Sequence, residues 1–203
     1  MLIEAVLSAL VNVVVLVLVP FGLYYGYHRW RHRRRLVEVA GRAGLRLGDP
    51  RYLAYAAIGA VILVAALLLF PPSLEASTGK GSGFAPFAGL GLGLDSVMLA
   101  LLYGVVKTGF AEEFLFRGLI AGSLGRRLPF IWANGLQGLM FLLPHALVLL
   151  SMPSQWIILP WVLAGALFGG WLRIRSGSIL GAWLMHAAAN ITVALSVAVR
   201  SVA

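Results

Sequence analysis

The chain has 203 residues, of which 61% are hydrophobic and only 11% are charged, with a formal net charge of +9. Soluble domains are usually about 45–50% apolar and about 25% charged, so this composition excludes an ordinary soluble protein and indicates a single integral membrane domain over residues 1–203. Cysteine is absent, which excludes disulfides, thiolate metal ligands and a cysteine nucleophile.

Six apolar segments have about the length of 20 residues that an α-helix needs to cross a bilayer. In chain order they cover about residues 3–27, 52–70, 97–121, 130–150, 156–173 and 178–199. The sequence therefore predicts an all-α, polytopic transmembrane bundle of about six spans. The run GFAPFAGLGLGL at 83–94 separates the second and third spans, and it is predicted to be an extramembrane loop or a segment that dips into the interface.

Arginine is concentrated in alternate connections between these spans. The first connection, 28–51, holds Arg29, Arg31, Arg33, Arg34, Arg35, Arg42, Arg46 and Arg51, the third (122–129) holds Arg126 and Arg127, and Arg173 and Arg175 mark the fifth (174–177). The fourth connection, 151–155, is neutral. The positive-inside rule places the three basic connections in the cytoplasm, and the predicted location is a prokaryotic cytoplasmic membrane. Such clusters contact anionic headgroups, so the expected partners of this charge are membrane lipids and not nucleic acid.

Five polar residues inside the predicted spans break the apolar pattern. Glu112 and Glu113 lie in the third span, His145 in the fourth, and His186 and Asn190 in the sixth. A charged side chain at the bilayer centre costs at least about 2.5–3.5 kcal/mol, so such residues face the bundle interior. With about 1.5 Å of rise per residue, Glu112, His145 and His186 lie about 21, 24 and 15 Å from the cytoplasmic ends of their helices. We therefore expect them to converge on a polar cavity at membrane depth.

Helical spacing pairs these polar residues with others. Pairs that are four residues apart share a helix face: Phe141 with His145, His186 with Asn190, and Glu113 with Arg117. The last pair is expected to form an intrahelical ion pair. A single buried histidine or asparagine often only joins helices through a hydrogen bond. Two adjacent carboxylates fit that role poorly, because they repel each other.

The sequence resembles one known family at these residues. EEFLFR (112–117) looks like the EExxxR motif of the CPBP family, FLLPH (141–145) matches its FxxxH motif, and HAAAN (186–190) matches its HxxxN/D motif. These are the CAAX-processing and bacteriocin-processing intramembrane endopeptidases, also called the Abi family, which include the Rce1-like proteases. The resemblance covers about residues 97–195, the expected catalytic core. Each motif alone is weak, whereas three in order on separate spans are specific.

The resemblance implies a helical bundle around a polar cavity, and hydrolysis of peptide bonds in or near the membrane plane. Its functional positions carry over to Glu112, Glu113, Arg117, Phe141, His145, His186 and Asn190. The expected substrates are membrane-associated peptides or proteins, prenylated CAAX-type or bacteriocin-like, that enter from the membrane or the cytoplasmic side.

Peptide hydrolysis needs an activated water and a group that stabilises the oxyanion. A carboxylate in a dry cavity is a stronger base than one in water, so Glu112 is predicted to be the general base, with His145 sharing its water. His186 and Asn190 are predicted to donate hydrogen bonds to the oxyanion. Arg117 is expected to hold the second glutamate ionised.

A zinc-dependent version of the same protease is the first alternative. Glu112, His145 and His186 are a His₂Glu donor set of the kind that binds catalytic zinc, with water in the fourth position. The family has been described both as metalloproteases and as glutamate proteases that need no metal, so the resemblance does not choose. The sequence has no HExxH motif, and hydrolysis without a metal is favoured.

Two other functions fit the same residues. Acidic and histidine side chains inside spans also mark proton or ion relays. A non-catalytic immunity or binding protein would keep the same cavity for a partner. A Glu112→Gln variant separates these functions from proteolysis, because it removes hydrolysis and leaves simple binding largely intact.

Overall fold

The computed structural model describes residues 2–79, 81–150 and 153–203. The elements in chain order are α1 (Leu2–Val13), η1 (Val14–Leu18), α2 (Val19–His32), α3 (Leu36–Arg42), α4 (Pro50–Leu69), α5 (Leu74–Thr78), η2 (Ala85–Phe87), α6 (Leu94–Leu101), η3 (Leu102–Phe110), α7 (Ala111–Glu113), η4 (Phe114–Ala121), α8 (Gly122–Leu124), α9 (Phe130–Ala146), η5 (Leu147–Leu150), η6 (Pro153–Ile158), α10 (Leu159–Ser176) and α11 (Leu180–Arg200). Segments η1, η3 and η4 are π-helical, and η2, η5 and η6 are 3₁₀-helical. The described residues contain no β-strand, which confirms the predicted all-α class.

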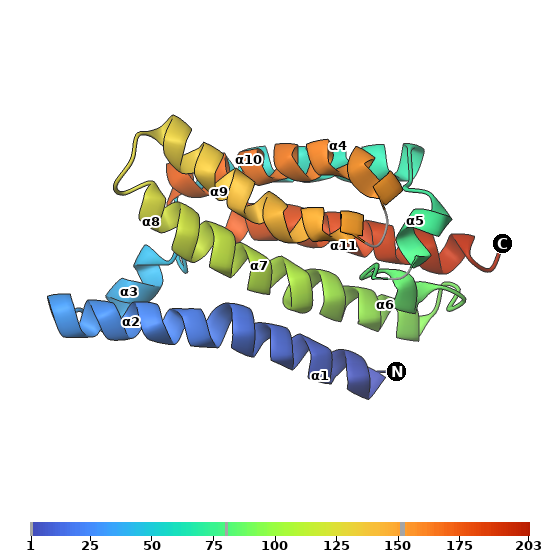
Figure 1. The fold of residues 1–203 in the computed structure, drawn as a ribbon, viewed down its shortest axis with the longest axis horizontal. Coiled ribbons are helices and arrows are strands. Elements are labelled where there is room, and N and C mark those ends of the chain that lie inside the picture. The colour runs from blue at the N-terminus through green and yellow to red at the C-terminus, as the bar shows by residue number, and fades with distance from the viewer. Residues whose placement is uncertain (1, 80, 151–152) are drawn as a thin grey trace.

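Five helices of the described chain are long and apolar enough to cross a membrane (Figure 1). They cover Leu2–His32, Pro50–Leu69, Leu94–Leu124, Trp156–Ser176 and Leu180–Arg200. These correspond to five of the six predicted spans, so the predicted count is close to the one found. All five begin or end within a few residues of the predicted limits.

The remaining predicted span, 130–150, is a shorter α-helix than expected. Helix α9 has 17 residues and ends at Ala146, and the 3₁₀ segment η5 follows it. Pro144 lies inside the last turn and weakens it, because it has no N–H to donate to the carbonyl four residues earlier. Residues 151 and 152 of the predicted fourth connection lie outside the described residues.

The third span is only partly α-helical. Two π-helical segments, η3 and η4, enclose the three α-helical residues of α7. π-Segments are rare and frequently occur at functional sites. Gly104 in η3 lets this span approach α11 closely, because a Cβ there would lie 3.0 Å from the carbonyl oxygen of Ala187 and 2.7 Å from a side-chain carbon of Ile191.

The three basic connections gather at one end of the bundle, and both chain termini lie at the other end (Figure 1). The first connection has more helix than predicted. Helix α2 continues to His32, Arg33 follows in the left-handed conformation, and the short helix α3 is placed against the ends of the spans. This grouping is what the predicted topology requires, while the cytoplasmic location of this end stays a prediction.

Helix α11 is fastened at its first turn to the connection between α3 and α4. The backbone N–H of Ile179 donates to the carbonyl of Gly44 at 3.1 Å, and the hydroxyl of Ser178 donates to the carbonyl of Arg46. Gly44 adopts a φ of 87°, which favours glycine, and this turn brings its carbonyl to the helix.

The glycine-rich run fastens the other end of α11. The N–H of Gly89 donates to Ser201 Oγ at 2.7 Å, and the N–H of Gly91 donates to the carbonyl of Ala198 at 3.2 Å. Phe87, 3% exposed, is buried in the core cluster formed with the last turns of α11. The region predicted to be a loop or an interfacial segment is therefore a folded cap on the bundle.

A polar network joins α9 to α10. Asn134 Nδ2 donates to the carbonyl of Leu167 at 3.0 Å, and Gln137 Nε2 donates to the carbonyl of Ala166 at 2.8 Å. Gln137 is fully buried, so these bonds satisfy amide N–H groups that would otherwise be costly between apolar helices. Gly170 leaves the room for this network, because a Cβ there would overlap both amide side chains.

We predict that Gly170→Ala destabilises the bundle by about 1–3 kcal/mol, as overpacking usually does. The matched control is Gly165→Ala on the same helix, where a Cβ meets nothing within 4 Å. That change is expected to be neutral or stabilising, because alanine favours helix over glycine by about 1 kcal/mol. Thermal unfolding of the purified protein in detergent measures both, and an equal effect of the two substitutions would contradict the described packing.

Candidate active site

Glu112 and Glu113 are adjacent in sequence but have different surroundings. Glu113 is only 2% exposed, whereas the side chain of Glu112 is 20% exposed. Successive residues of a helix point about 100° apart, so neighbouring side chains reach different neighbours. The buried carboxylate is held by the protein, and the other is the more accessible.

Arg117 pairs with the buried carboxylate. Its Nη1 lies 3.1 Å from Glu113 Oε1, and both side chains are almost completely buried. The intrahelical ion pair expected from the spacing is therefore present. The guanidinium also lies over the ring of Phe141, with its central carbon 4.0 Å from the ring centroid. Gly169 on α10 makes room for it, because a Cβ there would lie 3.2 Å from Arg117 Nε.

His186 on α11 bridges the two glutamates. Its Nδ1 donates to Glu113 Oε1 at 2.8 Å, and its Nε2 lies 4.0 Å from Glu112 Oε2. The carboxylate of Glu113 therefore fixes the ring orientation and leaves Nε2 directed at the more accessible glutamate. Sequence reasoning brought the third and sixth spans together correctly, but it did not identify the hydrogen bond between His186 and Glu113.

Asn190, one turn beyond His186, contacts a residue that the sequence analysis did not select. Its Nδ2 donates to Thr108 Oγ1 at 2.8 Å, and that hydroxyl donates to the carbonyl of Tyr103 at 2.9 Å. One N–H of the Asn190 amide is thereby used between helices. Threonine is common in spans and carries no charge, so its sequence context gave no signal.

His145 on α9 contacts the ring of Phe141, which in turn lies near His186. Its Nδ1 donates to the carbonyl of Phe141 at 2.8 Å, and the two rings have centroids 4.6 Å apart. The Phe141 ring in turn lies 6.2 Å from the ring of His186. No hydrogen bond or ion pair joins His145 to Glu112 within the described part of the chain.

The donor set proposed for zinc is not assembled into a metal site. Across residues 2–79, 81–150 and 153–203, no three side chains of His, Cys, Asp or Glu lie together as a group that could hold a metal ion. Glu112 and His186 approach each other, whereas His145 contacts the Phe141 ring and forms no ion pair with Glu112 in the described chain. The residues as arranged do not fit a His₂Glu zinc centre, and no catalytic step below passes through a metal.

A comparison with known protein families finds a match over the region that contains the candidate site. Residues 94–192 match the family model described as type II CAAX prenyl endopeptidase Rce1-like. The chain is Rce1-like over these residues. This confirms the resemblance predicted from three motifs, whose expected limits of 97–195 differ by three residues at each end. No curated protein and no solved structure matches the chain.

The match covers every residue of the candidate site, and the described chain has five helices that are long and apolar enough to cross a membrane. Trp183 lies within this Rce1-like core, and its Nε1 donates to the carbonyl of Val105 at 2.8 Å. This bond joins α11 to η3 close to the polar residues Thr108 and His186 of the two helices.

We predict that Arg117→Ala lowers stability by about 3–5 kcal/mol, because it leaves the Glu113 carboxylate buried without its cation. The double variant Arg117→Leu with Glu113→Gln is expected to lose less than the sum of its two single changes, because neither charge is then left alone. Thermal unfolding in detergent measures all of these variants. Additive losses would show that the two side chains are not coupled.

Proposed function

We propose that the chain is an intramembrane endopeptidase that hydrolyses peptide bonds of membrane-associated substrates. The observation that carries this proposal is the arrangement of His186, which is held by Glu113 at 2.8 Å and directs its other nitrogen at Glu112. The Rce1-like match supports the reaction class at the level of the family.

Glu112 is the proposed general base. A water beside its carboxylate gives up a proton to Glu112 as the water oxygen attacks the carbonyl carbon of the substrate. The proton then passes to the leaving nitrogen as the C–N bond breaks. Glu112 suits this role better than its neighbour, because its side chain is 20% exposed and Glu113 is occupied by Arg117 and His186.

The oxyanion needs hydrogen-bond donors at the position where charge develops. His186 supplies one from Nε2 when both ring nitrogens carry protons, and Glu113 positions the ring as a carboxylate does in other hydrolases. Asn190 retains one amide N–H beyond the one bonded to Thr108. We assign His145 to the same water, approached from α9.

The proposed substrates are prenylated CAAX-type or bacteriocin-like peptides and proteins. The family description names a CAAX prenyl endopeptidase, which supports the first class. A lipid anchor keeps such a peptide at the membrane, where a site inside the bundle can reach it. With the basic connections in the cytoplasm, the peptide enters from the cytoplasmic side or from the lipid.

Replacing Glu112 by Gln is expected to reduce cleavage by about 10²-fold or more, since the amide cannot take the proton. New peptide termini, compared between membranes that express the wild type and the variant, measure the loss and identify the substrates. Glu75→Gln, at an exposed glutamate of α5, is the matched control and should cleave normally. Identical termini from wild type and Glu112→Gln, with both proteins folded, would favour a binding or ion-relay role instead.

His145→Ala and His186→Ala are each expected to abolish cleavage while the protein still elutes from detergent extracts as a monodisperse species. The reason is that both imidazoles act on the water or the oxyanion, beyond any role in joining helices. Loss of monodispersity in both variants would show that the histidines serve mainly as interhelical contacts.

We propose that hydrolysis needs no metal, and an excess of EDTA should leave the activity of the purified protein unchanged. A zinc protease inhibited in the same detergent is the control. Loss of activity with EDTA and its recovery on adding zinc would establish the zinc-dependent version, with Glu112, His145 and His186 brought together by movement of α9.

A further inference from the structure

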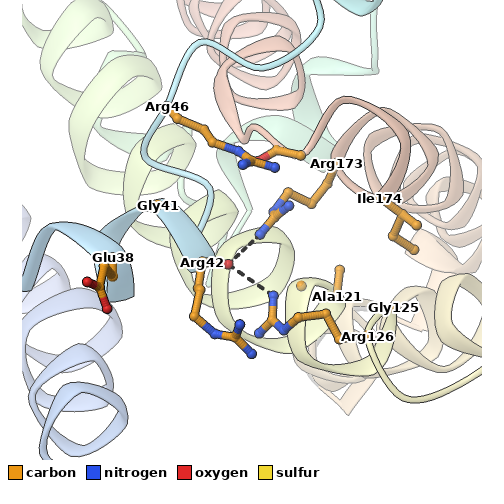
Figure 2. A pocket seen from close by; sticks show the side chains of 11 residues that line it. Glu38, Gly41, Arg42, Arg46, Ala121, Gly125, Arg126, Arg173 and Ile174 are labelled. Atoms are coloured by element: carbon orange, nitrogen blue, oxygen red, sulfur yellow. Dashed lines mark hydrogen bonds between the residues drawn. The ribbon is translucent and has the colours of Figure 1, made fainter. Parts of the chain in front are cut away.

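A pocket lined by arginines lies at the basic end of the bundle, away from the candidate active site. The cavity has a volume of about 460 Å³, and its lining includes Arg42, Arg46, Arg126 and Arg173 (Figure 2). Glu38 is the only acidic residue among those that line it. With four cationic side chains and one carboxylate, the pocket has an excess of positive charge that favours binding of an anion.

These arginines have no carboxylate partner. In the described part of the chain none of the four lies within 4 Å of an acidic side chain. Arg173 and Arg126 instead donate to one backbone oxygen, the carbonyl of Arg42, at 2.7 and 3.1 Å (Figure 2). Like charges are thus held together by a shared acceptor while their charge stays uncompensated.

Arg173 is the residue that points most directly to an anionic ligand. Its side chain is buried, with the residue only 4% exposed, and its Nε has no hydrogen-bond partner. A buried guanidinium without an anion is costly, so its usual surroundings include a carboxylate or a phosphate. In this protein the buried guanidinium of Arg173 borders the pocket instead.

Glycines give these guanidinium groups their room. A Cβ on Gly44 would lie 2.8 Å from Arg173 Nε, and a Cβ on Gly122 would press on the same guanidinium. On Gly177 a Cβ would overlap the guanidinium of Arg46. Three separate segments of the chain therefore have a glycine at a position where a guanidinium group packs against the backbone. This arrangement indicates a formed site and not a chance cluster of surface arginines.

The depth of the pocket indicates the kind of anion. Arg173 lies one turn before the end of α10 at Ser176, and Gly122 lies two residues before the end of the third span at Leu124. The ends of spans lie at the level of the lipid headgroups. Gly122 is nine residues beyond Glu113, or about 13 Å along the helix, so this pocket is separate from the site around His186.

We propose that this pocket binds the phosphate group of an anionic phospholipid headgroup. Guanidinium groups donate paired hydrogen bonds that match phosphate oxygens, and basic pockets between spans are known to take lipid headgroups. A bound phosphate would accept from Arg126 and Arg46 at the rim, and the buried charge of Arg173 would attract it from within. The lipid would tie α3, α8 and α10 together at this end of the bundle.

The test measures thermal unfolding of the full chain in detergent during titration with phosphatidylglycerol. Diacylglycerol with the same acyl chains is the phosphate-free control, and inorganic phosphate is titrated separately. We expect a saturable rise in the unfolding temperature with phosphatidylglycerol only, or with inorganic phosphate as well if the small anion alone fills the pocket. No rise beyond that given by diacylglycerol, together with none from inorganic phosphate, would overturn the proposal.

Variants separate this pocket from general attraction to anionic lipid. Arg126→Ala and Arg46→Ala, both at exposed lining residues, are expected to weaken the apparent affinity by about tenfold or more, as the loss of one charge-assisted hydrogen bond does. Arg127→Ala removes an equally exposed charge outside the lining and should change the affinity little. Equal weakening by Arg126→Ala and Arg127→Ala would show non-specific binding and overturn the proposal.

Discussion

The buried carboxylate of Glu113 is the interaction on which the site depends. One oxygen, Oε1, accepts from His186 at 2.8 Å and pairs with Arg117 at 3.1 Å, so a single group joins two helices and balances one cation. The carboxylate could not remain buried alone, and the guanidinium could not either. Because both are needed, the third span and α11 are fixed relative to each other at the depth where His186 faces Glu112. Glu112 is not held in this way and is the more accessible carboxylate of the two.

The helix that carries both glutamates does not direct its side chains as a regular α-helix would. The π-segments η3 and η4 on either side of α7 change the rotation between successive residues, so a face counted at 3.6 residues per turn drifts from the true one. The bond from the Thr108 hydroxyl to the carbonyl of Tyr103 spans five residues and reflects this geometry. This bond orients the hydroxyl so that its oxygen accepts from Asn190 Nδ2. The irregular helix thereby makes a second contact with α11, one turn from His186.

Much of the fold and part of the candidate site could be predicted from the sequence, for physical reasons that differ between elements. Long apolar runs identify spans directly, and the i, i+4 spacing of Glu113 and Arg117 led to their ion pair. Sequence spacing cannot show which of two adjacent carboxylates is buried, because this depends on α10 and α11 packing around the third span. The hydrogen bond from His186 to Glu113 and the place of Phe141 between two histidines follow from the same packing. The folded cap at 83–94 was also beyond reach, because glycine-rich sequence permits many backbone paths and the contacts with α11 select one.

Helix α11 is held at both of its ends, by the turn at Gly44 and by the cap at Gly89 and Gly91. A helix anchored in this way has little freedom to tilt or slide, so the fold itself fixes the positions of the His186 imidazole and the Asn190 amide. The proposed function requires a peptide to enter the bundle, and any movement that admits it would come from elements other than α11. Helix α9, with its 3₁₀ continuation after Pro144, is the one that also carries a histidine of the site.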